Sequence, residues 1–312
     1  MSPWEFRDVA FKFQLSDWTL FKASIRLQSR AIRLTEQIEP QALPVPPVDE
    51  LLEGSKGFVL RSLPVNALLP PLSRVGEYLC YVPLQYQHCY IDLRMSFDEY
   101  QKKFSSKTRS TINRKIRKFT EHSGGSLVWK TFRQPQELPE FFRLARAVSK
   151  LTYQEKLLDA GLPDSPEFIE QARSLAAQGC VRAYVLFDGT RPVSYLYCPV
   201  LDGVAIYAYL GYDPAYMQLS VGTVLQWLAL EQMFKDGDLK YFDFTEGQSD
   251  HKRLFATHQR ECANVFMVRD TLRHRAIFYG HRLMDRFSGW LGRTLDRLGL
   301  KTRVKQLLRF AT

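Results

Sequence analysis

The stretch from Tyr207 to Gly247 reads YAYLGYDPAYMQLSVGTVLQWLALEQMFKDGDLKYFDFTEG, and it decides the fold. It begins as a strand rich in tyrosine, passes through a loop that contains proline, and continues into residues 221–234, an apolar segment of helical length. That segment has almost no polar face, which predicts a helix buried against a sheet. Asp236-Gly237 predicts the end of this helix, and LKYFDF predicts the next strand. The order strand, loop, buried helix, strand predicts an α/β (α+β) protein.

Three strand-like runs lie upstream of this stretch or overlap its start. They read CVRAYVLF, PVSYLYCPV and GVAIYAYLG, and they are separated by the turn sequences at 188–191 and 202–203. Asp-Gly pairs in both turns are strong hairpin signals, so the runs predict an antiparallel meander. GFVLRSL and HCYIDL, earlier in the chain, predict further short strands.

The first forty residues predict a helix, because Leu20, Ala23, Leu27 and Leu34 lie near helical spacing. Four prolines between residues 40 and 47 predict a short extended linker after it. We therefore expect a helical arm with its linker over 1–45, an N-terminal lobe over 46–125, a core over 126–268 and a C-terminal helix over 269–312.

The composition excludes several classes of protein. The 312 residues are 45% hydrophobic and 24% charged, which excludes wholesale disorder and fibrous proteins. The five cysteines are scattered without a CxxC pair, so we expect reduced thiols, no disulfide framework and no metal site. The first residues lack the pattern of a secretory signal, and no run of 18 apolar residues occurs, so we expect a cytoplasmic protein.

The net charge of +10 is concentrated in two segments, which favours anionic partners. Residues 101–120 carry eight basic side chains and no acidic one, and residues 269–312 carry eleven basic and three acidic. Residues 107–121 predict a helix with Ile112, Ile116 and Phe119 on one face and the basic residues opposite. The basic face is either an anion-binding surface or an ordinary solvated face.

The loop before the buried helix is a candidate anion site. A helix N-terminus exposes free N–H groups and a partial positive charge, which suit a phosphate or pyrophosphate. Gly222 would let such a group approach the backbone closely. The alternative is that Ser220 is only a helix cap and Gly222 only a packing residue.

Taken with HKRLFA (251–256) and the basic stretch FSSKTRSTINRKIRKF (104–119), the stretch quoted first resembles the GNAT-type acyltransferases. More narrowly it resembles the CelD-like branch linked to cellulose and exopolysaccharide synthesis, which is related to the FemAB peptidyltransferases. The resemblance covers about residues 97–257. It implies a GNAT fold with a mixed, mostly antiparallel sheet, an acetyl-CoA or other acyl-CoA donor, and transfer to an amine or hydroxyl. The relation to FemAB implies that the chain could contain a tandem pair of GNAT lobes. It leaves open whether residues 1–96 form the second lobe.

The resemblance also implies roles for particular residues. The loop residues Leu219, Ser220, Val221, Gly222 and Thr223 would cradle the CoA pyrophosphate, and the strand 205–211 would pair with the pantetheine amides. Lys252 matches the lysine of an aromatic-Lys-x-x-Phe element that ends at Phe255.

Acyl transfer needs a base that deprotonates the acceptor. Asp243, Glu246 and His251 lie together just after the buried helix and are the candidate catalytic residues. Asp243, flanked by Phe242 and Phe244, is expected to project from the face opposite the two rings. Asp243 and His251 both remain open as the base, and Lys252, Arg114 and Lys115 are the candidates for holding an acidic acceptor. The alternative is that Asp243 caps a turn and its neighbours form a solvated loop.

Three functions remain open from the sequence. The first is an acyl-CoA-dependent N- or O-acyltransferase acting on a glycan or a nucleotide- or lipid-linked sugar. The second is a FemAB-like transferase that uses aminoacyl-tRNA, which would explain both basic segments. The third is a non-enzymatic protein that binds anions or membranes.

Residues 270–299 predict a basic amphipathic helix with Phe287 and Trp290 on its apolar side. Such a helix is typical of binding at a membrane interface, so we expect peripheral attachment to an anionic inner membrane face. The alternative is that its apolar stripe covers the protein core.

Overall fold

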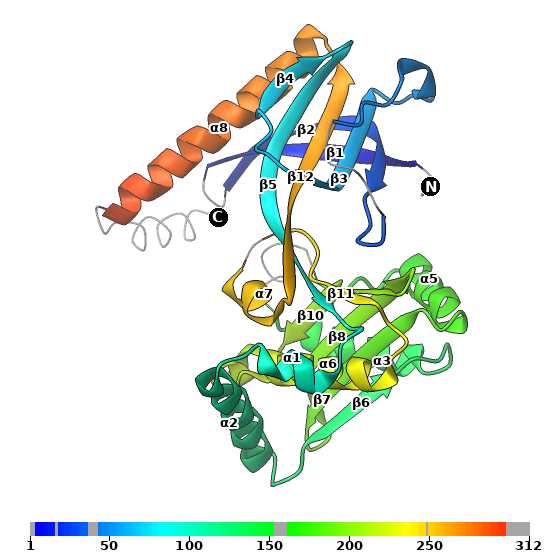
Figure 1. Ribbon diagram of the computed structural model, residues 1–312, viewed down its shortest axis with the longest axis vertical. Helices are drawn as coiled ribbons and strands as arrows, with labels where there is room; N and C mark the ends of the chain where they lie inside the picture. Colours follow the sequence, from blue (N-terminus) through cyan, green and yellow to red (C-terminus); the bar gives the residue numbers. More distant parts are fainter. Residues whose placement is uncertain (1–3, 16–17, 37–42, 153–160, 248, 298–312) are drawn as a thin grey trace. The chain divides into compact units, whose positions relative to one another are not determined.

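The computed structural model describes residues 4–15, 18–36, 43–152, 161–247 and 249–297 (Figure 1). The chain divides into two compact units. Unit 1 comprises Met1–Tyr86 and Glu261–Thr312, and unit 2 comprises Gln87–Arg260. Two long strands, β5 (Tyr78–Asp92) and β12 (His258–Arg269), contribute residues to both units.

Unit 1 is a sheet with one long helix. Its strands follow the order β1-β2-β3-β12-β5, and β4 pairs with β5. β2 and β3 are parallel, whereas β1–β2, β3–β12 and β4–β5 are antiparallel. The helix packs against β1. The other elements of this unit are β1 (Glu5–Leu15), β2 (Trp18–Ala31), the 3-10 helix η1 (Val48–Glu50), β3 (Gly57–Pro64), β4 (Leu72–Val75) and α8 (Leu272–Arg297).

The prediction of a helix in the first forty residues is wrong, because the segment forms the antiparallel strands β1 and β2. A period of two decides the structure: Phe11 and Phe13 on β1 are buried, as are Ile25 and Leu27 on β2. These side chains form one face of the sheet and pack into a core with Tyr81. The helical spacing of the leucines carried no structural information.

Unit 2 is also built on a sheet. Its strands follow the order β5-β11-β9-β8-β7-β6, with β10 pairing to β8. The pair β9–β11 is parallel and the others are antiparallel. Its elements are α1 (Phe97–Lys102), α2 (Ser106–His122), β6 (Val128–Phe132), α3 (Leu138–Ser149), α5 (Pro166–Ala177), β7 (Val181–Asp188), β8 (Arg191–Leu201), β9 (Val204–Ile206), β10 (Tyr209–Tyr212), η2 (Pro214–Leu219), α6 (Val221–Asp236), β11 (Tyr241–Asp243) and α7 (Asp250–Phe255).

The predicted buried helix is confirmed as α6, which packs against β7, β8 and β10. Eleven of its side chains or backbone positions are buried, and Gly237 ends it with a φ of 68°. The two hairpins of the meander are also confirmed. The run GVAIYAYLG, expected as one strand, is divided into β9 and β10, and this division shapes the site described below.

The domain boundaries expected at residues 45, 125 and 268 stay predictions. The two compact units divide the chain at other places, after Tyr86 and after Arg260, and α2 lies in unit 2. The beginning of the proline-rich linker and the basic tail from residue 298 onward lie outside the described residues. None of the described helices is long and apolar enough to cross a membrane.

Candidate functional site

The sheet of unit 2 forks where β9 ends. β9 and β11 run parallel from Val204 and Tyr241, and their last link is the hydrogen bond from the Tyr207 N–H to the Asp243 carbonyl, 2.9 Å long. Beyond this point β10 pairs with β8, whereas the Phe244 N–H bonds to the carbonyl of Cys89 on β5. The two chains therefore separate, and β10 keeps a backbone edge that no described strand pairs with.

Asp243 lies at the base of this fork. Its Oδ1 accepts hydrogen bonds from His88 Nε2 at 2.5 Å and from the Thr245 N–H at 2.7 Å. The second bond closes a tight turn in which Thr245 has a φ of 61°, so the alternative that Asp243 caps a turn is also correct. Its Oδ2 makes no hydrogen bond to a described residue, and 15% of the side chain is exposed. One oxygen thus fixes the carboxylate, and the other has no hydrogen-bond partner among the described residues.

Lys252 lies close to the predicted acidic residues. Its Nζ donates a hydrogen bond of 2.7 Å to the backbone carbonyl of Glu246, whose side chain is exposed. Burial lowers the pKa of the Lys252 ammonium, and the neighbouring Cys89, Asp243 and Glu246 partly oppose that shift. The structure therefore brings Asp243, Glu246 and Lys252 into one electrostatic group.

His251 is held from α6 rather than by Asp243. Its Nε2 lies 2.6 Å from Oε1 of Gln226, a fully buried residue of α6. Since an amide oxygen only accepts, this contact assigns the ring proton to Nε2 and leaves the lone pair on Nδ1. Burial lowers the pKa of His251 below its usual 6.5, and the positive charges of Lys115 and Lys252 lower it further. At neutral pH the ring is therefore uncharged and able to accept a proton.

The predicted phosphate loop lies where η2 passes into α6. Ser220 takes a left-handed conformation (φ 54°, ψ 37°) and its side chain makes no capping hydrogen bond. The first bond of the helix runs from Val224 N–H to the Ser220 carbonyl. The N–H groups of residues 221–223 precede it, and they donate to no acceptor in the described part of the chain. Free donors at the start of a 16-residue helix have the chemistry that suits an anion.

The basic helix α2 lies beside this loop. Lys118 Nζ donates a hydrogen bond of 3.3 Å to the carbonyl of Gln218, and the His122 ring meets the ring of Tyr216 edge-on at 5.7 Å. Phe119 and Ile112 anchor the opposite face of α2 in the core. Lys115 acts on the pKa of His251, whereas Arg114 is exposed and forms no ion pair with a described residue. The same helix thus places positive charge next to both the loop and His251.

Residues 106–253, from the start of α2 to α7, match the acetyltransferase (GNAT) domain family. This part of the chain has the GNAT acyltransferase fold. It contains the loop, Asp243, His251 and Lys252, but it begins after His88. The enzyme class expected from the sequence is therefore confirmed, as an acyltransferase.

One solved structure, FemX, shares the fold across more of the chain than the match to the GNAT domain. FemX covers 88% of this chain and 90% of its own at a TM-score of 0.51 and 10% identity, so its likeness extends into both units. The C-terminal domain of a putative lysylphosphatidylglycerol synthetase from Agrobacterium fabrum has a TM-score of 0.47, 9% identity, and covers 73% of this chain and 72% of that one. L-PGS from Bacillus licheniformis has a TM-score of 0.44, 14% identity, and covers 73% of each chain. Comparison with curated protein sequences gives no significant match.

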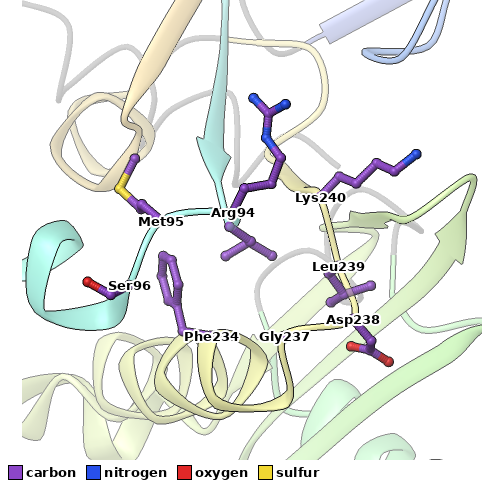
Figure 2. Close-up of a pocket in the computed structure, with 9 residues that line it drawn as sticks. Arg94, Met95, Ser96, Phe234, Gly237, Asp238, Leu239 and Lys240 are labelled. Atoms are coloured by element: carbon purple, nitrogen blue, oxygen red, sulfur yellow. The ribbon is translucent and has the colours of Figure 1, made fainter.

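The fork and the loop belong to the same end of the GNAT domain, and a separate hollow lies at the other end of α6. It has a volume of about 580 Å³ and is lined by Leu93, Arg94, Met95, Ser96, Phe234, Gly237, Asp238, Leu239 and Lys240 (Figure 2). Arg94 is paired with Asp92, and Asp238 with Arg182. None of the predicted site residues lines this hollow. Across the described residues, no group of three or more His, Cys, Asp or Glu side chains could hold a metal.

Two residues that sequence reasoning missed support the site. His88 comes from β5, far from Asp243 in the sequence, and only 2% of it is exposed. Nothing in HCYIDL indicates its partner. Gln226 gave a clearer signal, because an amide in the apolar run VLQWLAL needs a buried hydrogen-bond partner.

Because His88 cannot reach a substrate, we expect it to position Asp243. His88→Leu should lower kcat by about tenfold, the scale of one hydrogen bond to a charged group. His88→Gln should restore most of the rate, because its amide can donate to the same oxygen. Steady-state kinetics of both variants decide this, with KM for the donor expected to stay unchanged. Equal losses in the two variants would mean that His88 only fills the core.

Proposed function

We propose that this protein transfers an acyl group from acyl-CoA, most simply acetyl-CoA, to an amine or hydroxyl of a glycan or a glycan precursor. The observation that carries the donor assignment is the set of free N–H groups at residues 221–223, next to Lys118 of α2. A pyrophosphate offers several charged acceptor oxygens to these donors, and the helix dipole favours its negative charge. Leu219 and Ser220 form the turn that leads into these N–H groups.

The fork supports the position of the rest of the donor. The unpaired edge of β10 offers N–H and C=O groups to an extended molecule with amides of its own, such as pantetheine. β10 leads directly through η2 into the loop, so one molecule can contact the loop with its pyrophosphate and the strand edge with its amides. Its acyl end would then reach the base of the fork, where Asp243 lies.

The chemistry follows from this placement. Asp243 accepts a proton from the acceptor amine or hydroxyl, whose lone pair attacks the thioester carbonyl. The carbon–sulfur bond breaks, the acyl group stays on the acceptor, and the thiolate of CoA leaves and takes up a proton. Lys252, partly buried beside Asp243 and Glu246, offsets the negative charge that develops during the attack.

We also propose that the acceptor is a nucleotide-linked or lipid-linked sugar of polysaccharide synthesis, as the CelD-like resemblance implies. Arg114 is exposed and carries no ion pair with a described residue, and the charge of its neighbour Lys115 lowers the pKa of His251. These two side chains and Lys252 would hold the acidic part of such an acceptor. The positive charges of Arg114 and Lys115 suit a phosphate-bearing group.

The second candidate is a FemAB-like transferase that uses aminoacyl-tRNA. It is favoured by the likeness to FemX at the level of the fold and by the eight basic residues at 101–120. Calorimetric titration separates the two: acetyl-CoA should bind, and aminoacyl-tRNA should not compete with it. Binding of aminoacyl-tRNA without binding of acetyl-CoA would overturn the donor assignment.

The place of α2 in the donor site can be tested by charge reversal. Lys118→Glu should weaken acetyl-CoA binding by about tenfold, because it puts a negative charge beside the pyrophosphate. The matched control is Arg117→Glu, the same change one position along the helix, where the side chain is exposed and pairs with Glu121. Calorimetry at low salt measures both, and the difference should shrink at high salt as the charges are screened. Equal effects in the two variants would contradict a specific role for Lys118.

A further inference from the structure

The outer face of α8, in unit 1, is an apolar surface that the described residues leave exposed. The inner face carries the packing: Phe278 is fully buried, stacks on Tyr81 at 4.7 Å and meets Phe11 at 5.3 Å. His281 Nδ1 lies 2.7 Å from the hydroxyl of Tyr81, and Ile277 is also buried. The helix thus already has a complete contact with the sheet.

The residues on the outer face are large and mostly exposed. Their positions differ by seven, four, four and three, so they lie along one side of the helix, opposite the buried residues. Figure 1 shows α8 extending along its full length at the edge of unit 1. The exposed fractions are 84% for Leu272, 58% for Tyr279, 71% for Leu283, 48% for Phe287 and 54% for Trp290. The alternative that the predicted stripe covers the core is therefore wrong for these residues.

The surface continues onto the β1–β2 hairpin. Phe21 is 54% exposed and stacks on Phe13 at 4.2 Å between ring centres. Phe13 in turn lies against Gly280 of α8, where an added Cβ would come within 3.2 Å of its ring. We call the five residues of α8 together with Phe21 the outer patch. A contiguous exposed patch of this kind on a globular protein marks an interaction site.

A row of arginines borders the outer patch. Arg275, Arg282 and Arg286 are seven and four residues apart, so they follow the same flank of the helix. Arg275 is neutralised by Asp270, but Arg282 and Arg286 form no ion pair with a described residue. The acidic residue of this region is Asp285. Its Oδ2 lies 3.2 Å from Nδ1 of His281, on the inner side of the helix. The flank of the outer patch is therefore positively charged.

We propose that the outer patch binds the surface of an anionic lipid bilayer, with α8 lying in the plane of the interface. Tyr and Trp beside arginines are the side chains that prefer this depth, where rings enter the apolar layer and guanidinium groups meet phosphates. A second copy of the chain fits less well, because it would bring two positive rows together without an acid between them. This inference stands apart from the acyltransferase site, since it concerns unit 1 alone.

The experiment uses the full chain and vesicles of phosphatidylcholine with or without phosphatidylglycerol. The protein should sediment with the anionic vesicles at low salt and should not sediment with the neutral vesicles. Its affinity for the anionic vesicles should fall at least about tenfold at high salt. The fluorescence of Trp290 should shift to the blue on binding, and Trp290→Phe should remove that shift. No binding to anionic vesicles at low salt would overturn the proposal.

Substitutions are better than truncation here, because removal of α8 would uncover the core around Phe278. Leu283→Gln with Phe287→Gln should abolish binding, whereas Leu68→Gln, at a loop residue that is 86% exposed, should not. Arg282→Gln with Arg286→Gln should weaken it, whereas Arg143→Gln with Arg173→Gln, exposed arginines of unit 2, should leave it unchanged.

Two further measurements separate this proposal from its alternatives. Thermal unfolding should be nearly unchanged in all these variants, because the substituted side chains are exposed, apart from the half-buried Arg282, which forms no ion pair with a described residue. Acyl transfer without vesicles should be unchanged as well. A dimer in solution that the Leu283 and Phe287 substitutions dissociate, together with no vesicle binding, would instead identify the outer patch as an interface between two copies and overturn the proposal.

Discussion

Asp243→Asn should lower kcat for acyl transfer by at least about a hundredfold, or about 2.7 kcal/mol of transition-state free energy. The amide has the shape of the carboxylate, so its oxygen can still accept the hydrogen bonds of His88 and the Thr245 N–H. It cannot accept a proton from the acceptor. Donor binding should survive, because the loop at residues 219–223 is untouched. Initial rates at saturating acetyl-CoA, together with calorimetry, measure both quantities.

His251 is the competing base, and its pKa gives a way to separate the two. Its neutral form persists below pH 6.5 because burial and the charges of Lys115 and Lys252 lower its pKa. Lys115→Ala removes one of these charges and should raise the pKa of His251 toward its ordinary value. If His251 were the base, the acidic limb of the pH dependence of kcat would move to higher pH in this variant.

With Asp243 as the base, we expect that limb to stay in place in Lys115→Ala, and His251→Gln to retain most of the rate. The Gln side chain can still contact Gln226, so the variant tests the ring rather than the packing around it. If His251→Gln lost most of its rate of acyl transfer while Asp243→Asn kept nearly all of it, the base would be His251.

The elements near the site could be predicted from local sequence, for identifiable reasons. Asp-Gly pairs fix the two hairpins because glycine takes the positive φ of the turn, and both Gly189 and Gly203 do so. The helix α6 was predictable because an apolar run of helical length without a polar face has no other stable place than the core. The start of that helix also fixed the position of the loop proposed to bind the pyrophosphate.

The N-terminal strands and the fork could not be predicted in the same way. In β1 and β2, spaced leucines imitate a helical pattern, and the alternation of Phe11 and Phe13 decides the structure only through a sheet formed with distant segments. The fork depends on where β9 stops pairing with β11, a property of three strands together. His88 and Asp243 meet only because β5 lies beside β11.

For α8, the sequence predicted the helix and one apolar stripe, and it left open whether that stripe faces the core; the buried residues Ile277 and Phe278 lie outside the predicted stripe. Ile277 and Phe278 pack against the sheet because they fit against Phe11 and Tyr81. Hydrophobicity alone does not rank them above Leu283 and Phe287. Shape complementarity with a particular sheet is the missing information, and only the folded chain supplies it.

Gly222→Asp should abolish acetyl-CoA binding, because it sets a carboxylate among the N–H groups of residues 221–223 that would receive the pyrophosphate. Two negative groups within a few ångströms repel strongly where water is partly excluded. Calorimetric titration of the purified variant with acetyl-CoA is the direct measurement, and no heat of binding is the expected result.

The control for this variant is Gly222→Ala, because an added Cβ meets its own neighbours. It would lie 3.3 Å from Cδ1 of Tyr212 and 3.4 Å from Cδ2 of Leu210, so either substitution asks these side chains to shift by a few tenths of an ångström. Tyr212 is 36% exposed and can give way, which keeps the cost in folding small. Alanine should therefore bind acetyl-CoA within a fewfold of the parent, and both variants should unfold at similar temperatures. Loss of binding in Gly222→Ala would mean that packing against β10, and not charge at the loop, controls the site; undiminished binding in Gly222→Asp would place the pyrophosphate elsewhere.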